Sequence, residues 1–344
     1  MLQFWSGLEA FDQFKDLQDG FFASLSESEF EYVACPFGHT ECHPLFSKGS
    51  MRVVRCECGF VYNRRQAKQS ALVKFYETSD AANKWVEIKS GRGEVFRQQS
   101  KYYQAVQHLK SVGVKSIADI GCGNGEFLRA MKGAGTEIIH GFEMNEKAAA
   151  QARDGGAWVQ GGDLEYFIKN VSKNYDAISL WGVLEHLKDP LNAIKQLSQN
   201  LTAEGRLVIC VPNVNSLLVR TLWPQAFTFC PQHLWYFSAA SLSIMLQLCG
   251  FKTEHMYTIE TESIPVLKHM YGFDPYQPMP AWANRMYLKQ DWLDLMDRKI
   301  INDDDGYKIV LIGRKNAHSD NSSKSGKQKH KKQKSSEDWP KLVS

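Results

Sequence analysis

A glycine-rich turn between a strand and a helix is the feature that most constrains this chain. The segment reads Ala118-Asp119-Ile120-Gly121-Cys122-Gly123-Asn124-Gly125, and an apolar helical pattern follows it. Glycine lets a backbone turn sharply and approach a ligand where a Cβ atom would collide. In an open α/β sheet, the turn after the first strand lies where ligands bind. The turn therefore predicts a ligand site, although a GxGxG pattern is weakly specific when taken alone.

Strand-like and helix-like segments alternate around this turn. Strands are predicted at 116–120, 137–142, 175–181, 206–211, 251–259 and 307–314, and helices at 94–111, 126–132, 145–153, 190–201 and 238–248. Such alternation favours βαβ units, with a parallel sheet covered by helices on both faces. We therefore predict an α/β, Rossmann-like domain over residues 94–315.

Four other regions flank or interrupt this domain. We expect an N-terminal helical segment at 1–30, a cysteine-rich subdomain at 31–66, an aromatic-rich insertion at 260–306 and a disordered lysine-rich tail at 316–344. Long insertions in compact domains are often lids or binding loops, although the aromatic residues of 260–306 could equally pack a helical cap onto the body. The tail has too few apolar residues to offset its ordering entropy, and it is either a solubilising terminus or an arm that binds polyanions.

The charge distribution separates the tail from the body. The whole chain has 41 basic and 38 acidic residues, for a net charge of +3. Seven lysines against Asp320, Glu337 and Asp338 give the tail +4, which leaves −1 for the body. No apolar run approaches the ~20 residues of a membrane helix, and the first residues lack the basic start of a secretory signal. These features predict a cytoplasmic protein.

Acidic residues follow successive predicted strands. Glu143 ends the strand after the glycine turn, where a carboxylate can accept both hydroxyls of a ribose, and Asp163 stands at the next strand-to-loop transition. A single carboxylate in such a place often caps a helix instead. Together with Asp119, however, these residues make three acidic positions at successive strand ends, which favours a nucleoside-type ligand. A dinucleotide is disfavoured, because the fingerprint for it requires a third glycine where this chain has Glu126.

Four of the eight cysteines cluster early, at Cys35, Cys42, Cys56 and Cys58. Thiolates on two turns brought together across a hairpin would form a tetrahedral zinc site, with His39 or His43 as substitute ligands. The alternative is a metal-free remnant with buried thiols.

The ordered motifs resemble those of class I S-adenosylmethionine-dependent methyltransferases, in their small-molecule branch. The resemblance is carried by the glycine turn, by Glu143, by Asp163-Leu164, by Tyr175-Asp176-Ala177-Ile178 leading into Val183-Leu184-Glu185-His186, and by the segments 231–238 and 248–251. It implies a mostly parallel sheet with one antiparallel strand near the end, which residues 307–314 would supply. It also implies S-adenosylmethionine as the cofactor, held by Asp119, Gly121, Cys122, Gly123, Asn124, Gly125, Glu143, Met144, Asp163, Leu164 and Trp181.

The cysteine region is similar to the zinc-knuckle extension of sugar C-methyltransferases, which has two CxxC-like pairs. This chain departs from that pattern, because Gly38 stands where a cysteine is expected and Cys56-Glu57-Cys58 is one residue short. The resemblance implies structural zinc held by Cys35, Cys42, Cys56 and Cys58.

Histidine is the side chain best suited to take a proton from an oxygen or nitrogen acceptor near neutral pH. His186 and His233 are the candidate bases, with Glu185 able to orient an imidazole. The Leu-Glu-His turn is also a structural feature of many such enzymes, so a purely structural role is the alternative.

We expect the acceptor to be a small or carrier-linked molecule such as a sugar, a phenol or a quinone precursor, methylated at oxygen or carbon. Nucleic acid is the rival acceptor, since the cysteine region and the tail would both suit a polyanion. Against it stand the −1 charge of the body and the absence of an acid-Pro-Pro-aromatic motif after Trp181 and of a Pro-Cys dipeptide. A non-catalytic interaction protein is the third possibility, although the intact glycines and acidic positions argue against it.

Overall fold

The structure is a computed structural model that describes residues 2–90, 92–260 and 305–316. The predicted insertion at 260–306 and the predicted tail at 316–344 lie almost entirely outside these residues. No helix in the described ranges combines the length and the apolar character needed to cross a membrane.

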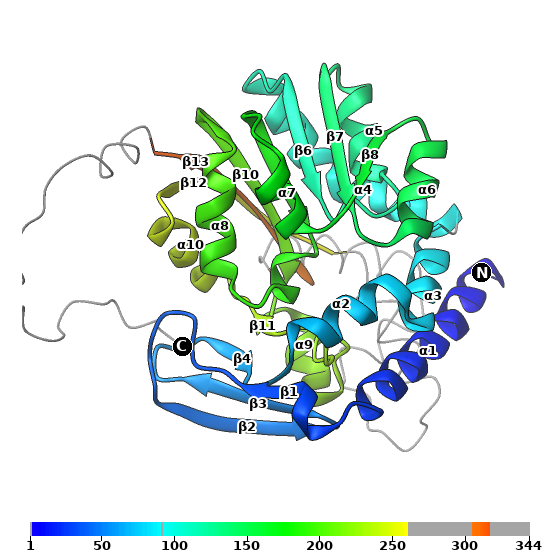
Figure 1. Cartoon of the computed structure of the whole chain (residues 1–344), viewed down its shortest axis with the longest axis vertical. Helices are drawn as coiled ribbons and strands as arrows, with labels where there is room; N and C mark the ends of the chain where they lie inside the picture. Colours follow the sequence, from blue (N-terminus) through cyan, green and yellow to red (C-terminus); the bar gives the residue numbers. More distant parts are fainter. Residues whose placement is uncertain (1, 91, 261–304, 317–344) are drawn as a thin grey trace, which may run out of the picture.

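The larger sheet has seven strands in the order β12-β13-β10-β9-β6-β7-β8 (Figure 1). Its strands are β6 (Ser116–Ile120), β7 (Ile138–Glu143), β8 (Trp158–Gly161), β9 (Tyr175–Trp181), β10 (Leu201–Pro212), β12 (Phe251–Ile259) and β13 (Lys308–Lys315). All neighbours are parallel except β13, which runs antiparallel to both β10 and β12. The α/β, Rossmann-like prediction, including the single antiparallel strand, is confirmed. Strand β8 had no predicted counterpart.

Helices cover both faces of this sheet, because neighbouring strand residues bury their side chains on opposite sides. Ile117 packs with α4 (Arg92–Ser111) and α5 (Glu126–Gly133). Ala118, the next residue, packs with α7 (Leu164–Asn170), α8 (Pro190–Gln199) and α10 (Ala239–Leu248). Helix α6 (Glu146–Asp154) packs its alanines against Val159 of β8. The carboxyl ends of the parallel strands stay uncovered by these helices.

A second sheet lies below the first in Figure 1 and is called here the cysteine-rich sheet. It has the order β11-β4-β3-β2, formed by β2 (Cys42–Lys48), β3 (Met51–Cys56), β4 (Val61–Asn63) and β11 (Trp235–Tyr236). Strand β11 comes from the segment after His233, so this sheet joins two distant parts of the chain. Phe60 packs against Trp235 and Phe237, with ring centroids 6.2 and 5.5 Å apart, within one continuous apolar core.

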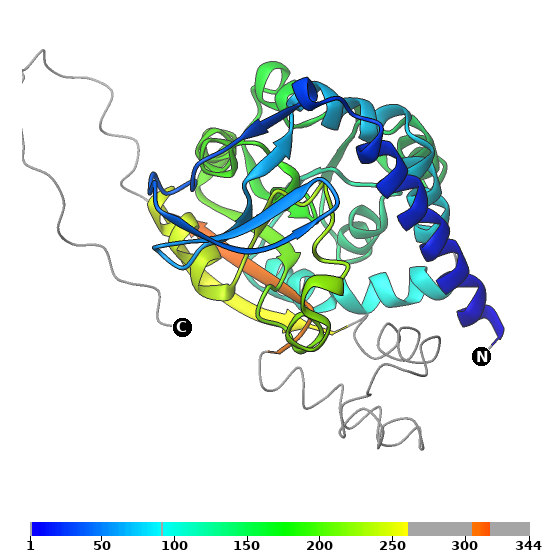
Figure 2. The same ribbon diagram turned by 90° about the horizontal axis from the view of Figure 1, so that it is seen from below.

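The remaining elements lie before and between the strands of these two sheets, and β1 and β5 pair with each other in a separate two-stranded sheet. They are α1 (Leu2–Ala23), η1 (Glu27–Glu29), β1 (Phe30–Tyr32), β5 (Arg65–Ala67), α2 (Gln69–Thr78), α3 (Asp80–Lys89), η2 (Leu184–His186), α9 (Leu217–Leu222) and η3 (Trp223–Gln225). Seen from below, the cysteine-rich strands lie in front of the larger sheet and α1 runs along one side (Figure 2). Phe11 of α1 contacts Phe227, and Gln18 Oε1 accepts a hydrogen bond from Nε2 of Gln232 at 2.6 Å.

Candidate active site

The glycine turn connects β6 to α5 at the carboxyl edge of the larger sheet. The amides of Gly121 and Cys122 both donate to the carbonyl of Phe142 in β7, at 2.8 and 3.1 Å. Gly121 has φ +69°, and a Cβ atom there would lie 2.6 Å from Cγ2 of Val183. Only glycine meets both conditions, which is why the turn can lie directly against the loop that follows β9.

Three carboxylates predicted from the sequence lie at this edge. Glu143 accepts hydrogen bonds from the amides of Gly123 (2.9 Å) and Asn145 (2.8 Å), which fix its position beside the turn. Asp119 is buried, and the Ser179 hydroxyl donates to it at 2.7 Å. Asp163 caps α7 by accepting from the amide of Tyr166 at 2.9 Å. The capping alternative considered for Asp163 is therefore realised, yet its side chain still borders the same space as the other two.

These residues surround one cavity of about 740 Å³. All the residues predicted to hold the cofactor line this cavity, except Gly125. Those that line it are Asp119, Gly121, Cys122, Gly123, Asn124, Glu143, Met144, Asp163, Leu164 and Trp181. Gly125 instead begins α5, where an added Cβ would lie 3.0 Å from Cβ of Ala152. The sequence predicts that Gly125 contacts the cofactor, whereas in the structure Gly125 lies where the start of α5 packs against α6.

The other end of the cavity holds Glu185, His186 and His233, which we call the Glu-His-His cluster. One ligand atom from each residue lies within 4.8 Å of the others, and the two imidazole centroids are 4.8 Å apart. His186 lies in η2 directly after β9. His233 is brought to it because the amide of Leu234 donates to the Glu185 carbonyl at 2.8 Å and β11 is held in the cysteine-rich sheet.

Backbone carbonyls orient both imidazoles. His186 Nδ1 lies 2.9 Å from the carbonyl oxygen of Gln232, and His233 Nδ1 lies 2.7 Å from that of Thr228. The closest approach of the Glu185 carboxylate to His186 is 3.9 Å, at Nε2, which is too long for a hydrogen bond. The prediction that Glu185 orients an imidazole is therefore replaced by orientation from carbonyl groups.

Burial controls the charge of this end of the cavity. It lowers the pKa of His186 to about 4 and the pKa of His233 well below its ordinary value, so both rings are neutral at pH 7. Burial also raises the pKa of Glu185 to about 7. At the other end of the cavity, burial raises the pKa of Asp119 to about 7 as well, against the opposing effect of the Ser179 hydroxyl.

Several residues of this site carried no motif in the sequence. Tyr76 places its hydroxyl 2.7 Å from Nδ1 of His186, and Gln18 of α1 reaches Gln232 beside the cluster. Phe227, Phe229 and Tyr307 add an aromatic wall. Their positions depend on contacts between segments more than 100 residues apart, which no local pattern reports.

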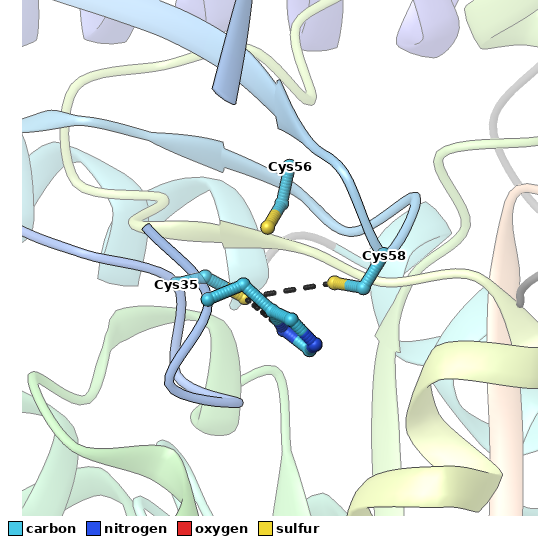
Figure 3. Close-up of side chains that lie close together, drawn as sticks. Cys35, Cys56 and Cys58 are labelled. Atoms are coloured by element: carbon cyan, nitrogen blue, oxygen red, sulfur yellow. Dashed lines mark hydrogen bonds between the residues drawn. The ribbon is translucent and has the colours of Figure 1, made fainter. Parts of the chain in front are cut away.

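Three of the four predicted metal ligands meet in the cysteine region (Figure 3). Cys35, Cys56 and Cys58 form a group with His39 in which one ligand atom of each lies within 4.8 Å of the others. The Sγ atoms of Cys35 and Cys58 are 3.7 Å apart, and Cys35 Sγ lies 3.9 Å from His39 Nδ1. Cys42 lies outside this group, and its sulfur accepts a hydrogen bond from Arg64 at 3.3 Å.

The backbone explains this exchange of Cys42 for His39. Two matching turns carry the group: the Gly38 amide donates to the Cys35 carbonyl at 2.9 Å, and the Gly59 amide donates to the Cys56 carbonyl at 2.8 Å. Cys42 instead begins β2, where ladder pairing with Cys56 fixes it in the sheet. The prediction of Cys42 as a ligand is corrected to His39, the substitute that the sequence had allowed.

Relatives with assigned activities are named as tRNA-modifying enzymes. The chain is 26% identical over 180 residues to the tRNA U34 carboxymethyltransferase of Idiomarina loihiensis. The aligned segment covers 49% of this chain and 55% of the relative. It is 26% identical over 177 residues to the enzyme of the same name from Vibrio parahaemolyticus, covering 49% and 54%. The chain thus spans about half the length of the curated relatives that it matches.

This comparison contradicts the expected small or carrier-linked acceptor. The matched relatives are named for a nucleic acid, which agrees with the alternative that the sequence analysis ranked lower. Two of the arguments against a nucleic-acid acceptor were too weak. A net charge of −1 averages the whole body and does not report the charges around one cavity, and the missing acid-Pro-Pro-aromatic motif bears only on acceptors with an exocyclic amine.

Two solved structures of methyltransferases have a similar chain path. One from Archaeoglobus fulgidus is 20% identical, with a TM-score of 0.48, and covers 67% of this chain and 99% of its own. Magnesium protoporphyrin IX methyltransferase from Synechocystis PCC 6803 is 14% identical, with a TM-score of 0.49, and covers 72% and 100%.

The family assignment comes from the sequence of the domain itself. The family model described as "Methyltransferase domain" matches residues 60–256, which is more than half of the chain. The match begins in the cysteine-rich sheet and includes the glycine turn, the three carboxylates and the Glu-His-His cluster. The chain belongs to this methyltransferase family.

Proposed function

We propose that this enzyme modifies a nucleoside of RNA, with a uridine of tRNA as the first acceptor to test. The observation that carries the proposal is the match to relatives named tRNA U34 carboxymethyltransferase over about half of this chain. The cavity supports it, because about 740 Å³ is near the upper part of the ~300–1,000 Å³ range of small-molecule sites and has room for more than one ligand group.

The cofactor end of the cavity fits S-adenosylmethionine. When bound, this cofactor supplies a methyl group on a positively charged sulfur, which needs no further activation. Gly123 presents a surface without a Cβ, and an added Cβ there would meet no atom within 4 Å. Glu143 would accept the ribose hydroxyls, Asp163 and Leu164 would border the adenine, and Asp119 would face the cationic part of the cofactor. Trp181 would flank the sulfur.

The acceptor end suits a flipped or single-stranded nucleoside. Tyr76, Phe227, Phe229 and Tyr307 line it, and aromatic faces stack on bases with about 1–3 kcal/mol per base. Lysines also line the cavity, among them Lys15, Lys48, Lys101 and Lys308. A loop nucleotide of tRNA is already partly unstacked, so it costs less to insert than a paired base.

Cofactor binding is expected to depend on pH through Asp119. Its folded pKa is about 7, whereas an ordinary aspartate ionises near 3.8, so Asp119 enters the folded protein protonated below neutral pH. A cationic ligand favours the ionised form and must expel that proton. Affinity for S-adenosylmethionine should therefore rise as pH increases toward 7, by at most about tenfold per unit, and level off above it.

Calorimetry in two buffers of different ionisation enthalpy would measure this proton release directly. Asp119→Asn should bind with nearly pH-independent affinity and without proton release. Folding stability has the opposite pH dependence to cofactor affinity. Protonated Asp119 contributes its full stabilisation below the unfolded pKa of 3.8, and this contribution is lost as pH rises through about 7. Affinity that falls between pH 5 and 7 would contradict the assignment of Asp119 to the cofactor.

The function is tested with purified full-length protein, radiolabelled S-adenosylmethionine and unmodified tRNA. Label should enter tRNA, and digestion to nucleosides followed by mass analysis should place one added methyl group on one uridine. Glu143→Ala is the matched control, because losing hydrogen bonds to an ionised group costs about 1.5–3 kcal/mol each and should weaken cofactor binding about 10- to 150-fold. Transfer to free nucleosides or metabolites but not to tRNA would contradict the RNA proposal. Absence of cofactor binding by folded protein would support a non-catalytic role.

We also propose that Cys35, His39, Cys56 and Cys58 hold a structural zinc ion. A zinc tetrahedron with bonds of about 2.3 Å to sulfur has edges of about 3.8 Å, close to the 3.7 and 3.9 Å separations found here. The hydrogen bond between Cys35 and Cys58 lowers the pKa of the Cys58 thiol and raises the pKa of the Cys35 thiol, so it favours the thiolate at Cys58 alone. The ion would join the turn before β2 to the turn after β3, next to Phe60, which contacts Trp235 of β11.

Two cysteine variants test this ligand set. Cys58→Ser should lose zinc and lower the melting temperature, while Cys42→Ser should keep about one zinc ion per chain at this site, because its sulfur lies outside the group. Metal analysis by mass spectrometry of the native protein and thermal unfolding provide the two measurements. Equal zinc loss in both variants would restore Cys42 to the ligand set, and protein purified without zinc that cannot bind it when added would remove the site.

A further inference from the structure

The Glu-His-His cluster has the arrangement that proteins use to prepare histidines as metal ligands. Both imidazoles use Nδ1 for a backbone carbonyl, at 2.9 Å for His186 and 2.7 Å for His233. This hydrogen bond fixes the tautomer in which Nδ1 carries the proton and Nε2 carries the lone pair. Metal-bound histidines nearly always have such a partner on the second nitrogen. The Tyr76 hydroxyl, 2.7 Å from Nδ1 of His186, adds to this outer layer.

Glu185 supplies the third group. Its side chain is 2% exposed, yet among the residues that the structure describes, its Oε2 atom has no hydrogen-bond partner. A buried carboxylate oxygen without a partner is costly and calls for a bound proton or cation. Oε1 of the same group lies 3.9 Å from Nε2 of His186, and one ligand atom from each of the three residues lies within 4.8 Å of the others.

The surroundings favour a metal ion over a second proton on the rings. Lys308 and Lys101 act on Glu185 electrostatically and partly offset the effect of its burial. The cluster also lines the acceptor end of the cavity, so that positions not taken by the protein face the substrate.

We propose that Glu185, His186 and His233 bind one divalent transition-metal ion, of the zinc or cobalt type, with at least one coordination position open to the cavity. Two histidines and one carboxylate form a common catalytic set for such ions, whereas magnesium prefers oxygen ligands throughout. This site is separate from the cysteine group, which has three sulfur ligands and no open position.

The metal site adds a chemical role to the proposed function, and its substrate is the acceptor proposed there, so this role rests on the proposed function. An acceptor hydroxyl that binds at the open position would have a lowered pKa and would lose its proton to water. The oxygen then forms its bond to the methyl carbon while the carbon–sulfur bond breaks, and the electron pair of that bond stays on sulfur. In this reading His186 and His233 act as ligands, and neither takes the proton.

Cobalt titration of metal-free, full-length protein tests the assignment independently of activity. Co²⁺ bound to thiolates absorbs strongly through sulfur-to-metal charge transfer, whereas Co²⁺ on nitrogen and oxygen ligands gives only weak visible bands. We expect two equivalents in the native protein, one of each kind. Glu185→Gln and His233→Ala should each lose the weak-band equivalent or weaken its binding at least tenfold, with the thiolate equivalent unchanged. Cys58→Ser should show the reverse.

The competing outcomes are distinct. If the only bound cobalt shows thiolate absorption, or if the second equivalent survives both Glu185→Gln and His233→Ala, the proposal is overturned. Circular dichroism and S-adenosylmethionine binding identify variants that failed to fold, and Glu185→Asp then serves as a shorter carboxylate that should bind cobalt more weakly in a folded chain. A second cobalt site in a protein that does not modify tRNA would uphold the metal site while the RNA proposal fails.

Discussion

Replacing His233 by alanine is expected to lower the rate of group transfer by about 10²- to 10⁴-fold, the usual effect of removing a group that assists proton loss from an acceptor. His233 lines the cavity as one of the three proposed metal ligands, with its ring centroid 4.8 Å from that of His186. None of the residues predicted to hold the cofactor belongs to the Glu-His-His cluster. Single-turnover transfer to tRNA should therefore collapse while calorimetric affinity for S-adenosylmethionine changes less than about threefold.

His140 provides a matched control for this substitution. It is also partly buried, and its Nδ1 lies 2.7 Å from the Tyr175 hydroxyl, but it stands on β7 and does not line the cavity. His140→Ala should cost stability similar to that lost in His233→Ala and leave transfer nearly unchanged. Equal loss of transfer in both variants, or a His233→Ala enzyme of normal rate, would show that the Glu-His-His cluster takes no part in the reaction.

Gly121→Ala is expected to produce the largest effect on folding stability among the cavity residues. A residue other than glycine in the left-handed region costs about 1–2 kcal/mol, and Gly121 has φ +69°. The new Cβ would also lie 2.6 Å from Val183 Cγ2, and overpacking of this kind costs about 1–3 kcal/mol. Chemical denaturation should therefore show a loss of about 2–5 kcal/mol.

The same substitution should also impair the site. Val183 directly precedes η2, so pushing it aside moves Glu185 and His186, and cofactor affinity should fall together with transfer. Gly133→Ala is the control: Gly133 ends α5, has no atom within 4 Å of an added Cβ, and should gain about 0.4–1 kcal/mol or stay unchanged. If the two variants had equal stability, the contact between the turn and Val183 would not constrain the fold.

The cysteine-rich sheet bears on catalysis through His233. The Leu234 carbonyl accepts from the Asn63 amide at 3.0 Å, and β11 pairs with β4, so the residues after His233 are part of this sheet. Phe60, two residues beyond Cys58, packs on Trp235. A zinc ion in the cysteine group would thus stabilise the strand that positions one member of the Glu-His-His cluster.

The residues that local sequence patterns predicted to hold the cofactor line one cavity, except Gly125. Asp119, Gly121 and Glu143 follow strands whose parallel order places all their carboxyl ends at one edge, so a correct fold class brings them together automatically. The prediction failed where the same residue type serves two purposes. Gly125 packs α5 on α6 rather than lining the cavity, and Cys42 pairs in a β ladder while His39 takes its place.

Local patterns in the sequence indicated the α/β sheet and the row of carboxylates, because each depends on periodicity and on spacing within a few dozen residues, whereas the single antiparallel strand was expected only from the resemblance to class I methyltransferases. Only the tertiary structure decided the acceptor end. His186 and His233 are 47 positions apart, Tyr76 comes from α2 and Gln18 from α1, and their meeting depends on β11 joining the cysteine-rich sheet. Contacts between such distant segments arise from packing of the whole chain, and no local pattern encodes them.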